Sequence, residues 1–158
     1  MTRLVVGIGE FVVSADPQVS IVTHALGSCV AVCLWDPEAR VGGMLHYLLP
    51  EAGLNSERAR RQPAAFADTG IPMLFRAAYE IGLSKHRCHV HLLGGAAGGG
   101  SDIGLRNTLI AKRLLRQNGV PIHGEALGGH AVRTVTLAIA TGHVQVSCGR
   151  SVIQEMGR

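Results

Sequence analysis

Eight short apolar runs separated by turn residues constrain what this chain of 158 residues can fold into. Each run is rich in Val, Ile and Leu and is bounded by Gly, Pro, Asp or Asn, which is typical of β-strands. The runs cover residues 3–8, 19–24, 29–35, 41–49, 88–94, 121–127, 131–139 and 143–148. Because "ATGH" at 140–143 predicts a turn, we expect the last two strands to form a hairpin.

Two longer segments show helical periodicity instead. In residues 68–82 and 102–119, apolar side chains recur every three or four positions, as on the buried face of an amphipathic helix. Strands in runs with two intervening helices predict an α+β fold, with a mixed, largely antiparallel β-sheet structure packed with two main helices. We expect one domain over residues 1–158, in which the polar stretch 51–63 forms a mobile loop.

Charge and composition argue against several classes of protein. The net charge of +4 mildly favours acidic partners. With two Tyr, three Phe and one Trp, the chain lacks the interleaved aromatic residues of single-stranded nucleic-acid binders. No apolar run approaches the ~20 residues that cross a bilayer, and the first residues do not resemble a signal peptide. We therefore expect no nucleic-acid binding, no membrane insertion and a cytoplasmic location, where the four cysteines stay reduced.

Cys29 directly follows the flexible pair Gly27-Ser28 and opens a strand-like run. A free cysteine is most often a small buried hydrophobe, which is one interpretation of this residue. The other is a nucleophile, because a Gly-Ser step can aim backbone N–H groups at a developing oxyanion. Cys33 lies four residues further along the strand, roughly 13 Å away, which excludes a direct disulfide and predicts a core position.

The pairing of strands 29–35 and 41–49 decides whether Cys29 meets His46. With a two-residue turn at Pro37-Glu38, the numbers of facing residues sum to 75 and His46 lies directly opposite Cys29. A turn two residues longer gives a sum of 77 and leaves the two on the same face, diagonally, about 7–8 Å apart. An even sum would place them on opposite faces, so the local pattern alone leaves the contact open.

Two other motifs do not complete a site. His89 and His91 alternate onto one strand face, but no flanking cysteine or carboxylate supplies the remaining metal ligands. "GGAAGGGS" at 94–101 places Gly100 where a phosphate-binding loop needs lysine. We expect neither a metal nor another cofactor, and we expect these glycines to let the backbone pass close to another segment or to the catalytic loop.

Six motifs nevertheless occur together in a specific order. They are "LGSCV" (26–30), "GGMLHYLLP" (42–50), "FADTGIPML" (66–74), "LLGGA" (92–96), "IGLRN" (103–107) and "LGGHAVR" (127–133). In order and spacing the chain resembles the CheD family of chemoreceptor glutamine deamidases over nearly its whole length. One departure is the glycine-rich continuation 97–100, where the family usually has bulkier residues.

The resemblance implies a function and an active site. The family hydrolyses glutamine side-chain amides of methyl-accepting chemotaxis receptors to glutamate and ammonia, through a cysteine thioester, and so modulates chemotaxis. Its catalytic cysteine, histidine and threonine match Cys29, His46 and Thr23, and the backbone at Gly27 and Ser28 would hold the oxyanion. A protonated His46 would lower the pKa of the Cys29 thiol from about 8.5 to about 6.

The expected partners follow from the same resemblance and from charge. Cytoplasmic receptor helices are rich in glutamate, which suits a basic protein. We expect substrate or partner contacts at Arg58, Arg60, Arg61, Arg106 and Asn107. Family members also bind a CheC-type phosphatase, so the alternative to a deamidase is a non-catalytic interaction module that binds this phosphatase or a receptor. A general hydrolase of small amides is a third, less favoured hypothesis.

Overall fold

The computed structural model describes residues 1–157 and contains two five-stranded β-sheets. The first has the order β2-β5-β4-β6-β7 and consists of Glu10–Ser14, Val41–Tyr47, Val30–Asp36, His89–Gly94 and Gly124–Leu127. The second has the order β1-β3-β8-β9-β10 and consists of Thr2–Val5, Val19–Leu26, Arg133–Ala138, Val144–Cys148 and Ser151–Met156.

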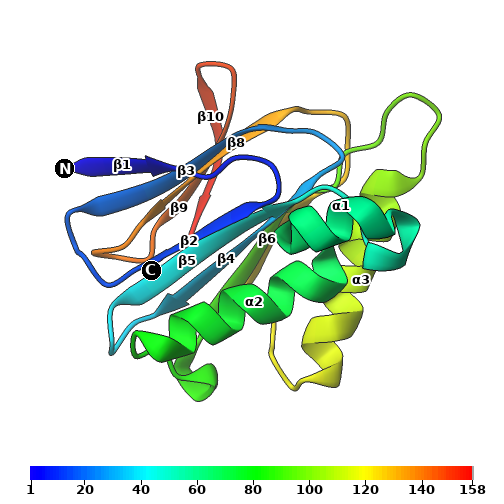
Figure 1. Cartoon of the computed structure of the whole chain (residues 1–158). Helices are drawn as coiled ribbons and strands as arrows, with labels where there is room; N and C mark the ends of the chain where they lie inside the picture. The colour runs from blue at the N-terminus through cyan, green and yellow to red at the C-terminus, as the bar shows by residue number, and fades with distance from the viewer. Residues whose placement is uncertain (158) are drawn as a thin grey trace.

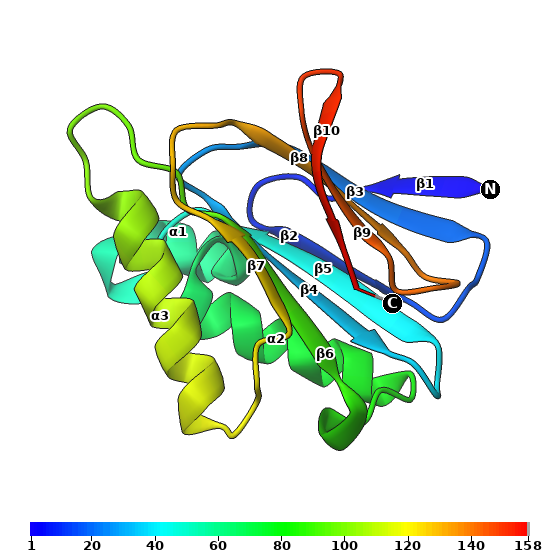
Figure 2. The same ribbon diagram turned by 180° about the vertical axis from the view of Figure 1, so that it is seen from behind.

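The helices form a third layer. They are α1 (Ser56–Arg61), α2 (Ala67–Glu80) and α3 (Ile103–Gln117), with three short 3-10 turns, η1 (Ala52–Leu54), η2 (Pro63–Ala65) and η3 (Lys85–Arg87). The α-helices lie on one side of the first sheet and the second sheet lies on its other side (Figure 1, Figure 2). Within residues 1–157, no helix is long and apolar enough to cross a membrane.

Strands β4 and β5 form the centre of the molecule, and all of their residues are buried. Side chains alternate across a strand, so Val30, Val32 and Leu34 pack toward the helices while Ala31 and Cys33 pack toward the second sheet. Cys33 therefore occupies the core position that its sequence context predicts. Two covered faces also explain why these strands are nearly continuous apolar runs.

The α+β prediction is confirmed, and the sheets are mixed. Strands β1 and β3 pair in parallel, as do β6 and β7, whereas the other paired strands are antiparallel. The predicted hairpin around 140–143 is the β8–β9 pair. Its partner strand β10 was not expected from the sequence; most of its residues are exposed, so it lacks a marked apolar run. Strand β2 was likewise not expected.

The expectation of a loop over residues 51–63 is wrong. This segment contains η1 and the helix α1, and neither element has a buried residue. Helix α1 consists largely of arginine and other polar residues. The Asn55 side chain accepts a hydrogen bond from the N–H of Arg58 at 3.1 Å and caps the helix. Without an apolar stripe the helix has no periodic signal, although this cap is visible in the sequence.

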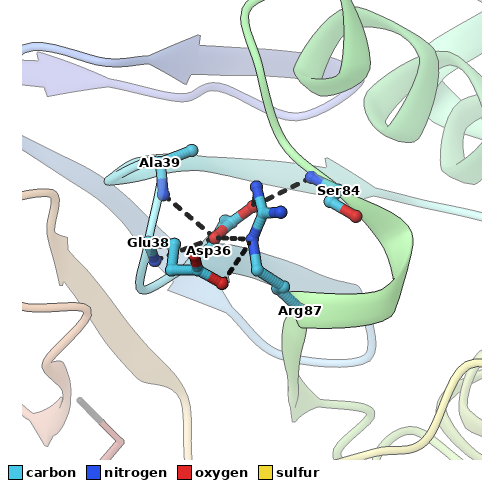
Figure 3. Close-up of polar contacts among 5 residues, drawn as sticks. All are labelled: Asp36, Glu38, Ala39, Ser84 and Arg87. Carbon is cyan, nitrogen blue, oxygen red and sulfur yellow. Dashed lines mark hydrogen bonds and ion pairs between the residues drawn. The ribbon is translucent and has the colours of Figure 1, made fainter.

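A buried carboxylate fastens the far end of β4. The Asp36 side chain, which is fully buried, accepts hydrogen bonds from Arg87 at 3.0 and 2.9 Å and from the N–H groups of Ser84, Glu38 and Ala39 (Figure 3). Burial by itself raises the pKa of Asp36, but these donors outweigh it and hold the pKa at about 2. The interaction ties the β4–β5 turn to the segment after α2.

We predict that Arg87→Ala lowers the free energy of unfolding by about 1–3 kcal/mol, because it leaves the buried carboxylate short of two donors. Since the pKa of Asp36 is lowered from 3.8 to about 2, its contribution is complete above pH 3.8 and is lost as the pH falls toward 2. Urea unfolding at several pH values measures both effects.

The matched control is Glu38→Gln, because Glu38 is exposed and lies 3.3 Å from the same guanidinium. An exposed ion pair contributes only about 0–1 kcal/mol. Equal losses in the two variants would contradict the role given to Asp36.

Candidate active site

The β4–β5 register places Cys29 and His46 on the same face of the first sheet. Ala31 pairs with His46 and Val30 with Tyr47, so the residue numbers of each facing pair sum to 77. This is the longer of the two turns considered from the sequence, and it leaves His46 diagonal to Cys29, which lies just before β4. Both residues lie in the layer between the two sheets, because Ala31 and Met44 of the same faces pack there.

Thr23 joins this pair from the second sheet. Its hydroxyl lies 2.7 Å from His46 Nδ1 and 2.7 Å from the carbonyl oxygen of Val6. Thr23 belongs to β3 and His46 to β5, so the hydrogen bond crosses from one sheet to the other. The structure thus brings two of the three predicted catalytic side chains into direct contact and places the third nearby in the register.

These two contacts determine which nitrogen of His46 carries the proton. The Val6 carbonyl can only accept, so the single hydroxyl proton of Thr23 goes to it. The Thr23 oxygen must then accept a hydrogen bond from Nδ1–H of His46. The other ring nitrogen, Nε2, therefore has a free lone pair; it is buried and has no partner within residues 1–157. An unprotonated Nε2 is what a general base requires.

Burial keeps the Cys29 thiol and the His46 imidazole neutral. It lowers the pKa of His46 from 6.5 to about 4. Burial also raises the pKa of the Cys29 thiol, although the N–H of Cys29 and the charge of Arg58 act in the opposite direction. The expectation of a thiol pKa near 6 beside a protonated histidine is therefore wrong for this state, because neither charge would be solvated there.

The loop around Cys29 is fixed by its carbonyl oxygens. The carbonyl of Cys29 accepts from Gly95 N–H at 2.8 Å and that of Gly27 from Ala96 N–H at 2.9 Å. Gly94 lies so close to the Cys29 carbonyl, with φ of 105°, that a side chain there would collide with it. The glycine-rich loop does pass close to the Cys29 segment, as expected. Within residues 1–157, the N–H groups of Ser28 and Cys29 donate to no backbone carbonyl, which suits the predicted oxyanion role.

A β-bulge precedes this loop. Thr23 pairs with Val135 and Leu26 with Arg133, so β3 has one more residue than β8 over this stretch. Ala25 adopts a left-handed conformation with φ of 55°, which is unusual for a residue with a side chain. The bulge lets both Thr23 and Leu26 point into the layer between the sheets.

A hollow of about 570 Å³ opens beside the Cys29 loop. Gly27, Ser28 and Leu48 line one side, and the glycine-rich loop, Ile103 and Val132 line the rest. A smaller hollow of about 230 Å³ lies between α2 and α3. Neither hollow is lined by Thr23, Cys29 or His46, but the larger one reaches Gly27 and Ser28, which directly precede Cys29.

The predicted contact residues divide into two groups. Arg60 and Arg61 on α1 and Arg106 on α3 are exposed, and Arg58 is half-buried with its guanidinium bonded to the Gln62 side chain at 3.0 Å. Asn107 differs, because it is completely buried and donates to the backbone. Nothing in the sequence distinguishes Asn107 from the exposed arginine beside it.

No group of three or more His, Cys, Asp or Glu side chains within residues 1–157 is arranged to hold a metal ion. His89 stacks on His123 instead, with ring centroids 4.5 Å apart. His91 is buried, and burial lowers its pKa to about 4, with the charges of His123 and His89 acting in the same direction.

Comparison with known proteins places this chain in a family. The family model described as CheD chemotactic sensory transduction matches residues 48–148. The chain is 46% identical over 156 residues to a probable chemoreceptor glutamine deamidase CheD of Anaeromyxobacter dehalogenans, covering 96% of this chain and 98% of that protein. The chain belongs to the CheD family.

Other CheD proteins are similar over comparable lengths. The chemoreceptor glutamine deamidase CheD of Thermotoga maritima is 39% identical over 147 residues, covering 91% of this chain and 90% of that protein. A probable one of Syntrophus aciditrophicus is 41% identical over 160 residues, covering 99% of this chain and all of that protein. The resemblance identified from the sequence motifs is therefore confirmed at the level of the CheD family.

We predict that Thr23→Val lowers the free energy of unfolding by about 1–3 kcal/mol, because it leaves buried groups of His46 and Val6 unpaired. Without an acceptor for Nδ1–H, the proton of His46 is no longer confined to that nitrogen. Imidazole nitrogen chemical shifts measure this change and urea unfolding measures the stability. Thr23→Ser keeps the hydroxyl and should resemble wild type in both; an unchanged tautomer in Thr23→Val would contradict the assignment.

Stability should also depend on pH through His46. Its pKa is lowered from 6.5 in the unfolded chain to about 4, so the unfolded chain binds the proton first as the pH falls. The contribution is complete above pH 6.5, and a shift of this size removes about 3 kcal/mol by pH 4. His91 acts in the same direction, so His46→Gln should reduce the loss without abolishing it. An unchanged profile in His46→Gln would contradict the prediction.

Proposed function

We propose that this chain is a cysteine-dependent deamidase that hydrolyses glutamine side-chain amides of chemotaxis receptors to glutamate and ammonia. Membership of the CheD family supports the reaction class, since the similar proteins carry the name chemoreceptor glutamine deamidase. The observation that carries the proposal is the hydrogen bond from His46 to Thr23, which leaves Nε2 as a free base on the face where Cys29 lies. A protein that only binds partners has no need of this arrangement.

The first step is attack of Cys29 on the amide carbon. His46 Nε2 removes the thiol proton as sulfur bonds to carbon, and the carbonyl oxygen becomes an oxyanion. The N–H groups of Ser28 and Cys29 donate to no backbone carbonyl within residues 1–157 and are the candidate donors to this oxygen. Because both groups start neutral, the proton moves during the attack rather than before it. The Thr23 oxygen then stabilises the imidazolium through Nδ1–H.

The intermediate collapses to a thioester. The carbon–nitrogen bond breaks, His46 Nε2–H gives its proton to the departing nitrogen, and ammonia leaves. Water then attacks the thioester carbon while Nε2, again unprotonated, takes one of its protons. When the carbon–sulfur bond breaks, that proton returns to Cys29, and the product is the glutamate side chain.

The surroundings of the site suit a helical, acidic substrate. Exposed Arg60 and Arg61 of α1 and Arg106 of α3 supply positive charge, and the hollow beside Gly27 and Ser28 can receive a protruding glutamine side chain. Cytoplasmic helices of chemotaxis receptors have this chemistry and are the proposed substrate. A CheC-type phosphatase as a second partner stays a prediction.

Incubation with a receptor cytoplasmic fragment tests the proposal. We expect the wild-type protein to convert individual glutamines of the fragment to glutamates, detected by intact mass and placed by peptide mapping. Cys29→Ala should abolish the conversion because it removes the nucleophile. Cys148→Ala is the matched control, since Cys148 is an exposed free thiol in a different part of the fold and should have no effect.

The other outcomes identify the alternatives. A fragment that binds to the wild-type protein but is not converted would favour the interaction module over the enzyme. Conversion by Cys29→Ala at the wild-type rate would contradict the role of Cys29. Hydrolysis of free glutamine at a rate similar to that of the fragment would favour a general hydrolase of small amides.

A further inference from the structure

One buried side-chain amide connects the two chain segments that carry the proposed catalytic pair. Asn107 of α3 donates from Nδ2 to the carbonyl oxygen of Ser28 at 3.0 Å and to that of Leu48 at 2.9 Å. Ser28 immediately precedes Cys29, and Leu48 follows His46 by two residues. Continued beyond its last pair, Val30 with Tyr47, the β4–β5 register would set Leu48 opposite Cys29.

The hydrogen bonds of the β4–β5 ladder do not hold the segments at Ser28 and Leu48 together. The ladder ends at the Val30–Tyr47 pair, and the N–H of Leu48 bonds to Ala65 instead. Asn107 therefore takes over at the point where the two segments would otherwise be free to separate. The orientation of its amide is fixed by chemistry, because both neighbours are carbonyl oxygens and only the NH₂ group can donate to them.

Burial of the Asn107 side chain costs free energy, and packing alone does not explain why an amide occupies this position. Asn107 is completely buried, and its Oδ1 has no hydrogen-bond partner within residues 1–157. An unpaired buried acceptor destabilises the fold, and an apolar residue at position 107 would carry no such acceptor. An amide is useful here because it supplies two donors, one for each segment. Asn107 is also tied to β5, since the Tyr47 hydroxyl donates to its backbone carbonyl.

We propose that Asn107 is a positioning residue, which fixes the separation of Cys29 and His46 by clamping the Ser28 and Leu48 carbonyls together. The inference rests on the proposed function for its catalytic consequence. Its structural content, a clamp across the mouth of the β4–β5 hairpin, does not depend on the reaction. Since misplacement of reacting groups by 1 Å is sufficient to slow a reaction strongly, the clamp should affect the chemical step more than substrate binding.

The experiment compares Asn107→Ala and Asn107→Asp with wild type. Alanine removes both donors together with the unpaired Oδ1, and aspartate keeps the shape while replacing the donors by a carboxylate. We expect kcat on the receptor fragment to fall by about 10- to 100-fold, with KM changed by less than about 3-fold. Amide hydrogen exchange should accelerate at residues 27–30 and 47–49 while the rest of α3 stays protected.

Leu115→Ala is the matched control, because Leu115 is buried on the same helix but far along it from Ser28 and Leu48. It should reduce stability without the selective loss of kcat and without accelerated exchange at those two segments. Tyr47→Phe is a milder second variant, which removes only the anchoring hydroxyl and should give a smaller effect of the same kind.

The outcomes separate this inference from the proposed function. Wild-type protein without deamidase activity would defeat the proposed function, while the exchange measurement would still test the clamp. Active variants whose kcat equals that of wild type, or exchange that accelerates along all of α3 instead of at the two segments, would overturn the clamp. A KM increase with unchanged kcat would assign Asn107 to substrate binding and also overturn it.

Discussion

The hydrogen bond between Thr23 and His46 depends on the stacking of the two sheets. Each residue lies on a different sheet, and the 2.7 Å contact forms only when the sheets lie face to face with their side chains interleaved. The apolar layer between them thus does more than stabilise the fold, because it holds His46, the proposed base, in register with the Thr23 hydroxyl. Activity and folding should therefore be lost together when this layer is disturbed.

The same burial determines how the proposed nucleophile behaves at rest. Susceptibility of a cysteine to oxidation follows its thiolate character and exposure, and Cys29 has little of either. A protein with a preformed thiolate would react with any small electrophile, whereas a neutral thiol beside a neutral imidazole becomes nucleophilic only when a substrate carbonyl accepts the developing charge. Under the proposed function, selectivity follows from the dry environment as well as from the shape of the hollow.

Much of the architecture could be predicted from the sequence because it is encoded locally. Central strands such as β4 and β5 are continuous apolar runs between turn residues, and α2 and α3 have apolar stripes. Strand β10 and helix α1 bury too little apolar surface to produce such a pattern. The separation of Cys29 and His46 depended on a turn length that the sequence left open, although each of the two turn lengths considered put both on one face.

The least predictable parts of the site are those held by backbone atoms. Asn107 bonds to carbonyl groups 79 and 59 positions away. Every residue has the same backbone carbonyl, so no pattern of side chains in the sequence indicates which carbonyls Asn107 contacts. The pKa of Cys29 differs from the expectation for a related reason. Burial by two sheets is a property of the assembled fold, and it outweighs the pairing of charges that the residue types suggest.

The bulge at Ala25 makes the length of β3 as important as its composition. In a regular strand, residues 23 and 26 would point to opposite faces, and only the extra residue brings both inward. Removing or adding one residue between them would reverse the face to which one of the two side chains points. Either the Thr23 hydroxyl or the segment that leads from Leu26 to Cys29 would then turn away from the layer between the sheets. Lineages that preserve this geometry should therefore accept many substitutions at the exposed position 24 and only residues that tolerate a φ of 55° at position 25, with no change in the number of residues between Thr23 and Leu26.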